Sequence, residues 1–431
     1  MKILEMNKNK VFLCMIFLMI FALTNCLSPV TAEPVLGTHP ANFQPTITKA
    51  VTIEPAHTPT IQAYFDNMTR DCVKILDNPQ LSDLPTVSLF IDPVEYGESS
   101  FILNLPTGSK TFLGRTLEAT VSGNGGLVAY WDLDKTSVIV SDNGGNIIRV
   151  IQDSDEKLTP VHWIDDQRLL LSHRTGEMGG EYSVESLMIM DLKTGNLQEW
   201  LPEYPSLDTW PSSVSWNIFS RFLFNPELTY LVYQAREEGS NWLILWDIEK
   251  KKEVTRVFGT HNDDTPWWSP DGKQFVTWGF PQYEFSNNLY FTVNDGLPYV
   301  GGVDLFSVDQ SGEIKRLTYF STTKFAVESS TKWSPNGTAI AFMLQLAGGN
   351  ENILDVVPEL SVLTLDTNQV TNLCISGYDL MWSPDGKYIM LNQGQNEGKE
   401  RNEVYIVDLD QKLAWKVAEN AEGQGWMTEK P

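Results

Sequence analysis

Histidine and acidic side chains are the residue types in this chain that could bind a metal ion. Of the five histidines, His162, His173 and His261 lie away from the N-terminal stretch, and Asp263 and Asp264 follow His261 closely. Imidazole and carboxylate ligands from these positions could converge on a divalent cation. The histidines are scattered, however, and none has the H-x-x-x-H spacing of a helical metal site. We therefore expect no metal and no other cofactor.

Nucleophilic catalysis has no support in the sequence either. The Gly-x-Ser-x-Gly elbow, which presents the nucleophile of an α/β-hydrolase, does not occur. A peptidase built from a hydrolase domain is thereby excluded for this chain. We expect no catalytic residue and a protein that is not an enzyme.

Aromatic residues in stretches that lack a strand pattern are the stronger candidates for ligand contacts. Exposed aromatic rings can stack on a sugar or anchor a peptide. The alternative is that these rings pack the loops against their own scaffold. The predicted ligand-binding residues are Tyr182, Trp210, Trp216, Tyr283, Phe285 and Tyr290.

The charge balance restricts the class of partner. The chain has 31 Lys and Arg against 55 Asp and Glu, which gives a formal net charge of −24. Binding to nucleic acid depends on clustered basic residues, so a nucleic acid partner is excluded. A basic partner remains compatible, and strong like charge favours a soluble monomer.

The N-terminus has the pattern of an export signal. Lys2, Lys8 and Lys10 precede an apolar run over 11–23. That run is too short to span a bilayer comfortably. We therefore expect an extracytoplasmic protein.

Two cleavage sites fit this signal. The sequence Leu-Thr-Asn-Cys over 23–26 resembles the lipobox of bacterial lipoproteins, which predicts a signal peptide over 1–25 and lipidation at Cys26. The rival is an ordinary secretory cut after Ala32, which follows Val-Thr. The first alternative gives a protein that is lipid-anchored to the cell membrane, with that lipid as its one membrane contact. The second gives a secreted protein.

Residues 26–83 are predicted to be a linker and lead-in. Their first part is rich in Thr, Pro and Ala and has no hydrophobic period. Cys72 and Cys374 are the cysteines left beyond the signal region, and in an oxidising compartment they could pair. Whether they do cannot be judged from the sequence.

A tight-turn motif recurs along the rest of the chain. Pro presets φ, Asp or Asn bonds its own following backbone and Gly takes positive φ, so Ser-Pro-Asp-Gly closes an antiparallel hairpin. The preceding Trp is expected to be buried where neighbouring units meet. The three clearest copies start at Trp268, Trp333 and Trp382, and their repeat residues are Trp268, Asp271, Gly272, Trp333, Gly337, Trp382, Asp385 and Gly386. Three drifted copies start at Val121, Trp163 and Phe224, and Leu228 replaces the turn Gly in the last of them.

Each turn is followed by a second signature, a β-branched run before an Asp or turn cluster. Four short strands per period are typical of a propeller blade. The motifs resemble the WD-like propeller repeats of the TolB family, most closely at 268–273 and 382–387. We therefore predict an all-β propeller over 84–431.

The ends of the chain predict the number of blades. Residues 424–426 form an inner strand without a blade behind it, and 86–91, 101–105 and 111–114 form outer strands without an inner one. Joining them closes a ring of seven blades, which removes exposed sheet edges. The TolB resemblance instead implies six.

The strand order places both short turns of each blade on one face and the long connections on the other. Loops on a rigid scaffold are the usual place for binding residues. The TolB resemblance implies protein–protein interaction, so we expect binding of an envelope protein, peptide or glycan. Pectin-degrading lyases with similar repeats hold a divalent metal through histidines, which makes a metal-dependent pectate-type lyase the alternative.

Overall fold

The computed structural model describes the chain from residue 68 to residue 428 with gaps. The described residues are 68–76, 79, 84–95, 97–151, 157–175, 183–200, 222–237, 240–259, 267–279, 302–323, 325–346, 357–394 and 402–428. No helix in these ranges is long and apolar enough to cross a membrane.

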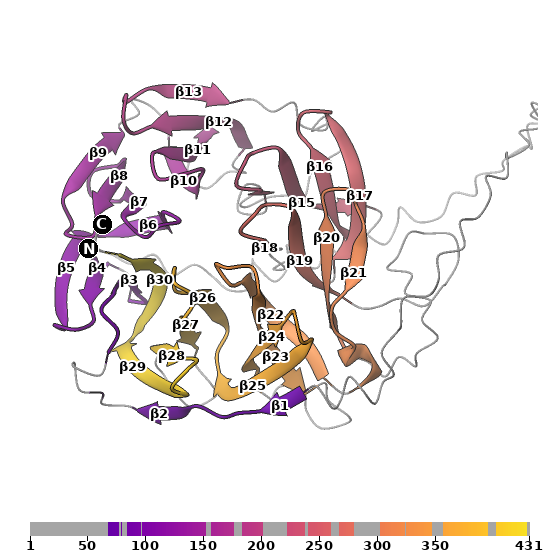
Figure 1. Cartoon of the computed structure of the whole chain (residues 1–431). Coiled ribbons are helices and arrows are strands. Elements are labelled where there is room, and N and C mark those ends of the chain that lie inside the picture. The colour runs from indigo at the N-terminus through magenta and orange to yellow at the C-terminus, as the bar shows by residue number, and fades with distance from the viewer. Residues whose placement is uncertain are drawn as a thin grey trace, which may run out of the picture. The chain divides into compact units, whose positions relative to one another are not determined.

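The described strands form seven sheets, which are the blades of a propeller (Figure 1). Blade 1 contains β6 (Thr116–Val121), β7 (Leu127–Asp132), β8 (Ser137–Asp142) and β9 (Ile147–Ile151). Blade 2 contains β10 (Lys157–Trp163), β11 (Arg168–Thr175), β12 (Ser183–Asp191) and β13 (Leu197–Trp200). Blade 3 contains β14 (Phe222–Phe224), β15 (Tyr230–Glu237), β16 (Ser240–Asp247) and β17 (Lys252–Gly259).

The remaining four blades follow the same order. Blade 4 contains β18 (Trp267–Trp268), β19 (Gln274–Gly279), β20 (Asp304–Asp309) and β21 (Ile314–Arg316), and the 3-10 helix η4 (Phe320–Thr322) follows it. Blade 5 contains β22 (Phe325–Trp333), β23 (Ala339–Leu346), β24 (Glu359–Thr364) and β25 (Gln369–Ser376). Blade 6 contains β26 (Asp379–Trp382), β27 (Tyr388–Gln393), β28 (Glu403–Asp408) and β29 (Leu413–Glu419). Blade 7 contains β30 (Ala421–Met427), β3 (Ser88–Pro93), β4 (Ser100–Asn104) and β5 (Ser109–Gly114).

Blade 7 joins the two ends of the described chain. The C-terminal strand β30 pairs antiparallel with β3, with Leu89 opposite Trp426 and Asp92 opposite Glu422. The prediction of seven blades is confirmed, and the alternative of six is wrong. The first strand named for each blade is the innermost one, as Figure 1 shows for β6, β10, β26 and β30.

The repeated turns have the geometry that their residue types predict. In the copy that starts at Trp268, Gly272 has φ +67°, and its N–H donates to the Ser269 carbonyl oxygen at 2.8 Å. Asp271 accepts a hydrogen bond from the Ser269 hydroxyl at 2.7 Å. In blade 3, Leu228 adopts φ +58° and donates to the Asn225 carbonyl oxygen at 2.9 Å. The drifted copy therefore keeps the turn at the expense of a strained leucine backbone.

The motif tryptophans join neighbouring blades through a hydrogen bond that we call the tryptophan clasp. The indole Nε1–H of Trp163, Trp268, Trp382 and Trp426 donates to a backbone carbonyl on the innermost strand of the preceding blade, at 2.8 to 3.1 Å. The acceptors are Thr120, Leu223, Lys332 and Met381. Each acceptor immediately precedes the motif residue of its own blade. The expectation that these rings lie where neighbouring units meet is confirmed.

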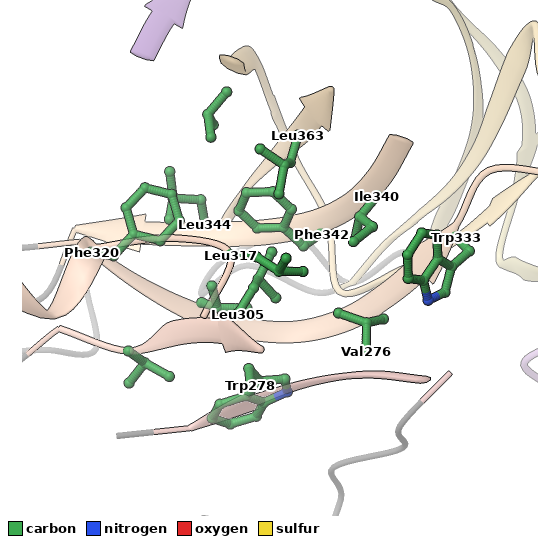
Figure 2. Packing of buried hydrophobic residues seen from close by; sticks show 13 residues of the cluster. Val276, Trp278, Leu305, Leu317, Phe320, Trp333, Ile340, Phe342, Leu344 and Leu363 are labelled. Atoms are coloured by element: carbon green, nitrogen blue, oxygen red, sulfur yellow. The ribbon is translucent and has the colours of Figure 1, made fainter. Parts of the chain in front are cut away.

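The seam between blades 4 and 5 departs from this pattern. Trp333 packs in a cluster with Val276, Trp278 and Leu305 of blade 4 (Figure 2). Its Nε1–H is buried and has no hydrogen-bond partner among the described residues. The corresponding acceptor is the carbonyl of Trp267 in β18, a strand of two residues. Apolar packing, together with a backbone hydrogen bond from Val327 N–H to the Val303 carbonyl oxygen at 3.2 Å, holds this seam in place of the tryptophan hydrogen bond.

Part of the predicted lead-in forms a strap along the outer edges of two blades (Figure 1). β1 (Met68–Arg70) pairs parallel with β25, and β2 (Lys74–Leu76) pairs parallel with β29. Between them, Cys72 and Cys374 form a disulfide with Cα atoms 4.8 Å apart. The structure thus joins the two cysteines whose pairing the sequence left open. The boundaries of the signal and linker stay predictions, because residues 1–67 lie outside the described ranges.

Candidate functional site

The two faces of the propeller carry different connections. The turns between first and second strands and between third and fourth strands are short and lie on one face, which we call the short-turn face. The connections between second and third strands and between blades lie on the other, the long-loop face. The six predicted ligand-binding aromatics, Tyr182, Trp210, Trp216, Tyr283, Phe285 and Tyr290, lie outside the described residues, as do Cys26, His261, Asp263 and Asp264.

A polar cluster of described residues lies at the long-loop end of the innermost strands of blades 5 to 7. It contains Ser330, Tyr378, Asp379, Asn402 and Glu422. β26 begins at Asp379 and β30 at Ala421, so Tyr378, Asp379 and Glu422 lie where the chain enters these strands. The strands position the cluster because they are fixed by pairing and by the tryptophan clasps further along.

Glu422 is the main acceptor of the cluster. Its Oε1 accepts hydrogen bonds from the Tyr378 hydroxyl at 2.8 Å and from Asn402 Nδ2 at 3.1 Å. Tyr378 is 37% exposed, so its ring remains accessible to a ligand. Burial raises the pKa of Tyr378 above its usual range, and the hydrogen bond to Glu422 and the charges of Glu422 and Asp379 act in the same direction. The phenol therefore stays protonated and acts as a donor.

Ser330 links blade 5 to this group. Its Oγ lies 2.9 Å from the Tyr378 carbonyl oxygen and 2.9 Å from Asp379 Oδ1. Ser330 itself has φ +50°, which is uncommon for a residue other than glycine. The pairing of β22 with β23 is irregular at this point, between Ser329 and Lys332.

Asp92 extends the acidic character into β3. It lies opposite Glu422 in the sheet, and the Ser100 hydroxyl donates to its Oδ1 at 2.6 Å. Burial raises the pKa of Asp92; the Ser100 hydrogen bond lowers it, and the charge of Glu422 raises it further. Asp92 and Glu422 thus share a site that favours protonation of Asp92 or the approach of a cation.

A lysine of β22, the innermost strand of blade 5, contacts an aromatic ring. The Lys332 ammonium lies 3.5 Å from the centre of the Trp267 ring, which is 39% exposed. Burial lowers the pKa of Lys332, and the charge of Asp379 acts against that shift. The innermost strands therefore present an acidic cluster in blades 6 and 7 and a lysine amino group stacked on an aromatic ring between blades 4 and 5.

The histidine of the inner strands does not join a metal-ligand set in the described part of the chain. His162 lies in β10, the innermost strand of blade 2. Burial lowers its pKa to about 4, so its imidazole is neutral at pH 7. Among the described residues, no three His, Cys, Asp or Glu side chains converge as metal ligands.

The sequence reasoning missed the polar cluster. Its signal is an acid just before the motif Trp in the last two repeats: Asp379 precedes Trp382, and Glu422 precedes Trp426. These acids fall outside the repeated turn, so a search for recurring turns passes over them. The cluster offers hydrogen-bond acceptors, a phenol donor and negative charge, which suit a cationic ligand or one rich in hydroxyl and amide donors.

Comparison with known proteins adds solved structures of similar architecture. TolB from Acinetobacter baumannii is similar at 14% identity over 75% of this chain and 77% of that one, with a TM-score of 0.40. An oligogalacturonate lyase from Vibrio parahaemolyticus is similar at 13% identity over 77% of this chain and 93% of that one, with a TM-score of 0.46. Pyrococcus horikoshii acylaminoacyl peptidase is similar at 12% identity over 79% of this chain and 54% of that one, with a TM-score of 0.46.

The TolB resemblance of the repeats thus recurs among solved structures. The same set includes enzymes, and at such identities and TM-scores the similarities say nothing about activity. No protein-family model matches the chain, and no curated protein sequence matches it. The functional argument therefore depends on the residues of this chain.

Proposed function

We propose that the protein is a non-enzymatic, extracytoplasmic propeller that binds a protein, peptide or glycan partner through its long-loop face. The observation that carries this proposal is the polar cluster, in which Tyr378 donates to Glu422 while remaining 37% exposed. Its groups are held by strands and by one another before any ligand arrives. Such preorganisation lowers the entropic cost of binding.

The location outside the cytoplasm has two supports. The N-terminal pattern predicts export, and the Cys72–Cys374 disulfide fits an oxidising compartment. Lipidation at Cys26 is part of the proposal, with cleavage after Ala32 as its rival. The mass of the mature N-terminus distinguishes the two.

The test is a crosslinked pull-down from native envelopes with identification of the captured protein or glycan by mass spectrometry. The variant Y378F/E422Q removes the hydroxyl and the charge of the cluster. The matched control Y388F/E249Q makes the same chemical changes on the short-turn side, at the start of β27 and in the turn after β16. We expect capture to fall in the cluster variant alone. Equal capture by all three proteins would remove the cluster from the binding site.

The alternative, a metal-dependent pectate-type lyase, has its own measurement. Metal content is determined on the purified protein, and polygalacturonate cleavage is followed by ultraviolet absorbance. Stoichiometric metal together with product formation would replace the binding proposal by an enzymatic one.

A further inference from the structure

A groove of about 190 Å³ lies between blades 6 and 7. The β3–β4 connection and β4 form one wall, and the end of β29 with Asn420 forms the other. Pro93 and Ala421 line its inner end, and they lie one position from Asp92 and Glu422 in the same pair of strands. The groove is thus adjacent to the polar cluster along the backbone of the β3–β30 pair, although the side chains of Asp92 and Glu422 do not line it.

The groove contains an ammonium group supplied by the protein itself. Lys110 Nζ lies 4.1 Å from the centre of the Phe101 ring, which is 6% exposed. Phe112, which pairs with Phe101 across β4 and β5, is 66% exposed and extends the apolar surface. A lysine side chain makes two favourable contacts with such a surface. Its methylene groups pack on the apolar side chains, and its ammonium lies over the ring face.

The walls hold more negative than positive charge. Glu95 and Glu98 line the groove, are exposed and have no side-chain partner among the described residues. Glu419 also lines it and accepts a hydrogen bond from Lys416 at 2.6 Å. With three carboxylates against one ammonium among its lining residues, the groove can accept another cation in addition to Lys110.

We propose that this groove binds a basic side chain of a partner peptide segment, which replaces the Lys110 ammonium on Phe101 and pairs with Glu95 and Glu98. The inference rests on the proposed function, because it takes the long-loop face as the binding face, and it names the chemistry of the partner. The partner segment is basic, and it continues from the groove toward Glu422 and Tyr378. Lys110 is a displaceable occupant of the site that the partner uses.

The test is calorimetric titration of the full-length protein with a capped peptide of six lysines, and with the corresponding glutamine peptide as the uncharged probe. The variant E95Q/E98Q removes the free carboxylates, and its control E249Q/E313Q removes two exposed carboxylates from short-turn loops. The variant K110A removes the competing ammonium, and its control K193A removes an exposed lysine from the β12–β13 turn. Melting temperatures confirm that all variants are folded.

We expect the two groove variants to change affinity for the lysine peptide in opposite directions. E95Q/E98Q weakens binding about threefold to tenfold, as expected for two exposed ion pairs. K110A strengthens it about twofold to fivefold, because the Phe101 face is no longer occupied. The two control variants should change the affinity for the lysine peptide little. The glutamine peptide should bind weakly to every variant.

Two results would overturn the inference. Equal effects of groove and control variants would mean that the lysine peptide responds to net charge alone. Absence of lysine-peptide binding would also overturn the inference. In that case the pull-down with Y378F/E422Q would show separately whether the proposed function survives. Conversely, groove-dependent peptide binding with an unchanged pull-down would retain the groove and remove the proposed partner role of the cluster.

Discussion

The two faces of the propeller use their residues for different purposes. On the short-turn face, Ser-Pro-Asp-Gly turns and motif tryptophans recur from blade to blade and bond to backbone groups. On the long-loop face, Tyr378, Asp379 and Glu422 lie outside the recurring turn and bond to each other and to neighbouring side chains. The residues of the repeat fix the blades, and residues outside the repeat form the polar cluster. Changes on the short-turn face should therefore affect stability, and changes on the long-loop face should affect binding.

The largest effect is expected from the ring closure. Trp426 lies in the core between blades 6 and 7 and donates to the Met381 carbonyl oxygen at 3.1 Å. Trp426→Ala should lower the free energy of unfolding by about 3 to 5 kcal/mol, because it leaves a cavity and removes the clasp. Denaturant unfolding measures this loss. A change below that of an ordinary surface substitution would show that blade 7 does not close the ring in solution.

The strap gives the second-largest effect. The Cys72–Cys374 disulfide ties β1 and β2 to the outer edges of blades 5 and 6 across a sequence separation of 302. The double variant C72A/C374A should lose about 2 to 4 kcal/mol of unfolding free energy. Reductant should lower the melting temperature of the wild type and leave that of the double variant unchanged. Equal sensitivity of both proteins to reductant would contradict the disulfide.

The clasp itself can be isolated by comparing two tryptophans. Trp382 donates to the Lys332 carbonyl oxygen, whereas the Trp333 Nε1–H has no partner among the described residues. Phenylalanine keeps an aromatic ring and removes the donor. Trp382→Phe should therefore cost about 1 kcal/mol more than Trp333→Phe, since Trp382→Phe alone breaks a hydrogen bond. Equal losses in unfolding free energy would show that the clasp adds no stability.

How far the sequence predicts this molecule depends on whether a feature is local. The turns and the motif tryptophans depend on residues adjacent in sequence, so the seven blades and their strand order could be inferred, including closure by 424–426. The strap could not, because β1 and β2 are three residues long and are held by edges that lie far away in the sequence. The polar cluster could not be inferred either, because Ser330, Tyr378 and Glu422 meet only through the ring of blades.

The smallest expected effect is a dependence of stability on pH that arises from Asp92 on the long-loop face. Burial raises the pKa of Asp92, so the folded protein holds that proton more tightly than the unfolded chain does. The resulting stabilisation is complete below the unfolded pKa of about 3.9 and is lost as pH rises through the raised folded pKa. The variant D92N places an amide here, which cannot titrate but can still accept the hydrogen bond that Ser100 gives to Asp92. The melting temperature of the wild type relative to D92N should therefore be highest at pH 3.5 and fall toward neutral pH, by about half a degree for an effect of a few tenths of a kcal/mol. A relative melting temperature that rises with pH would mean instead that the folded protein stabilises Asp92 as the anion.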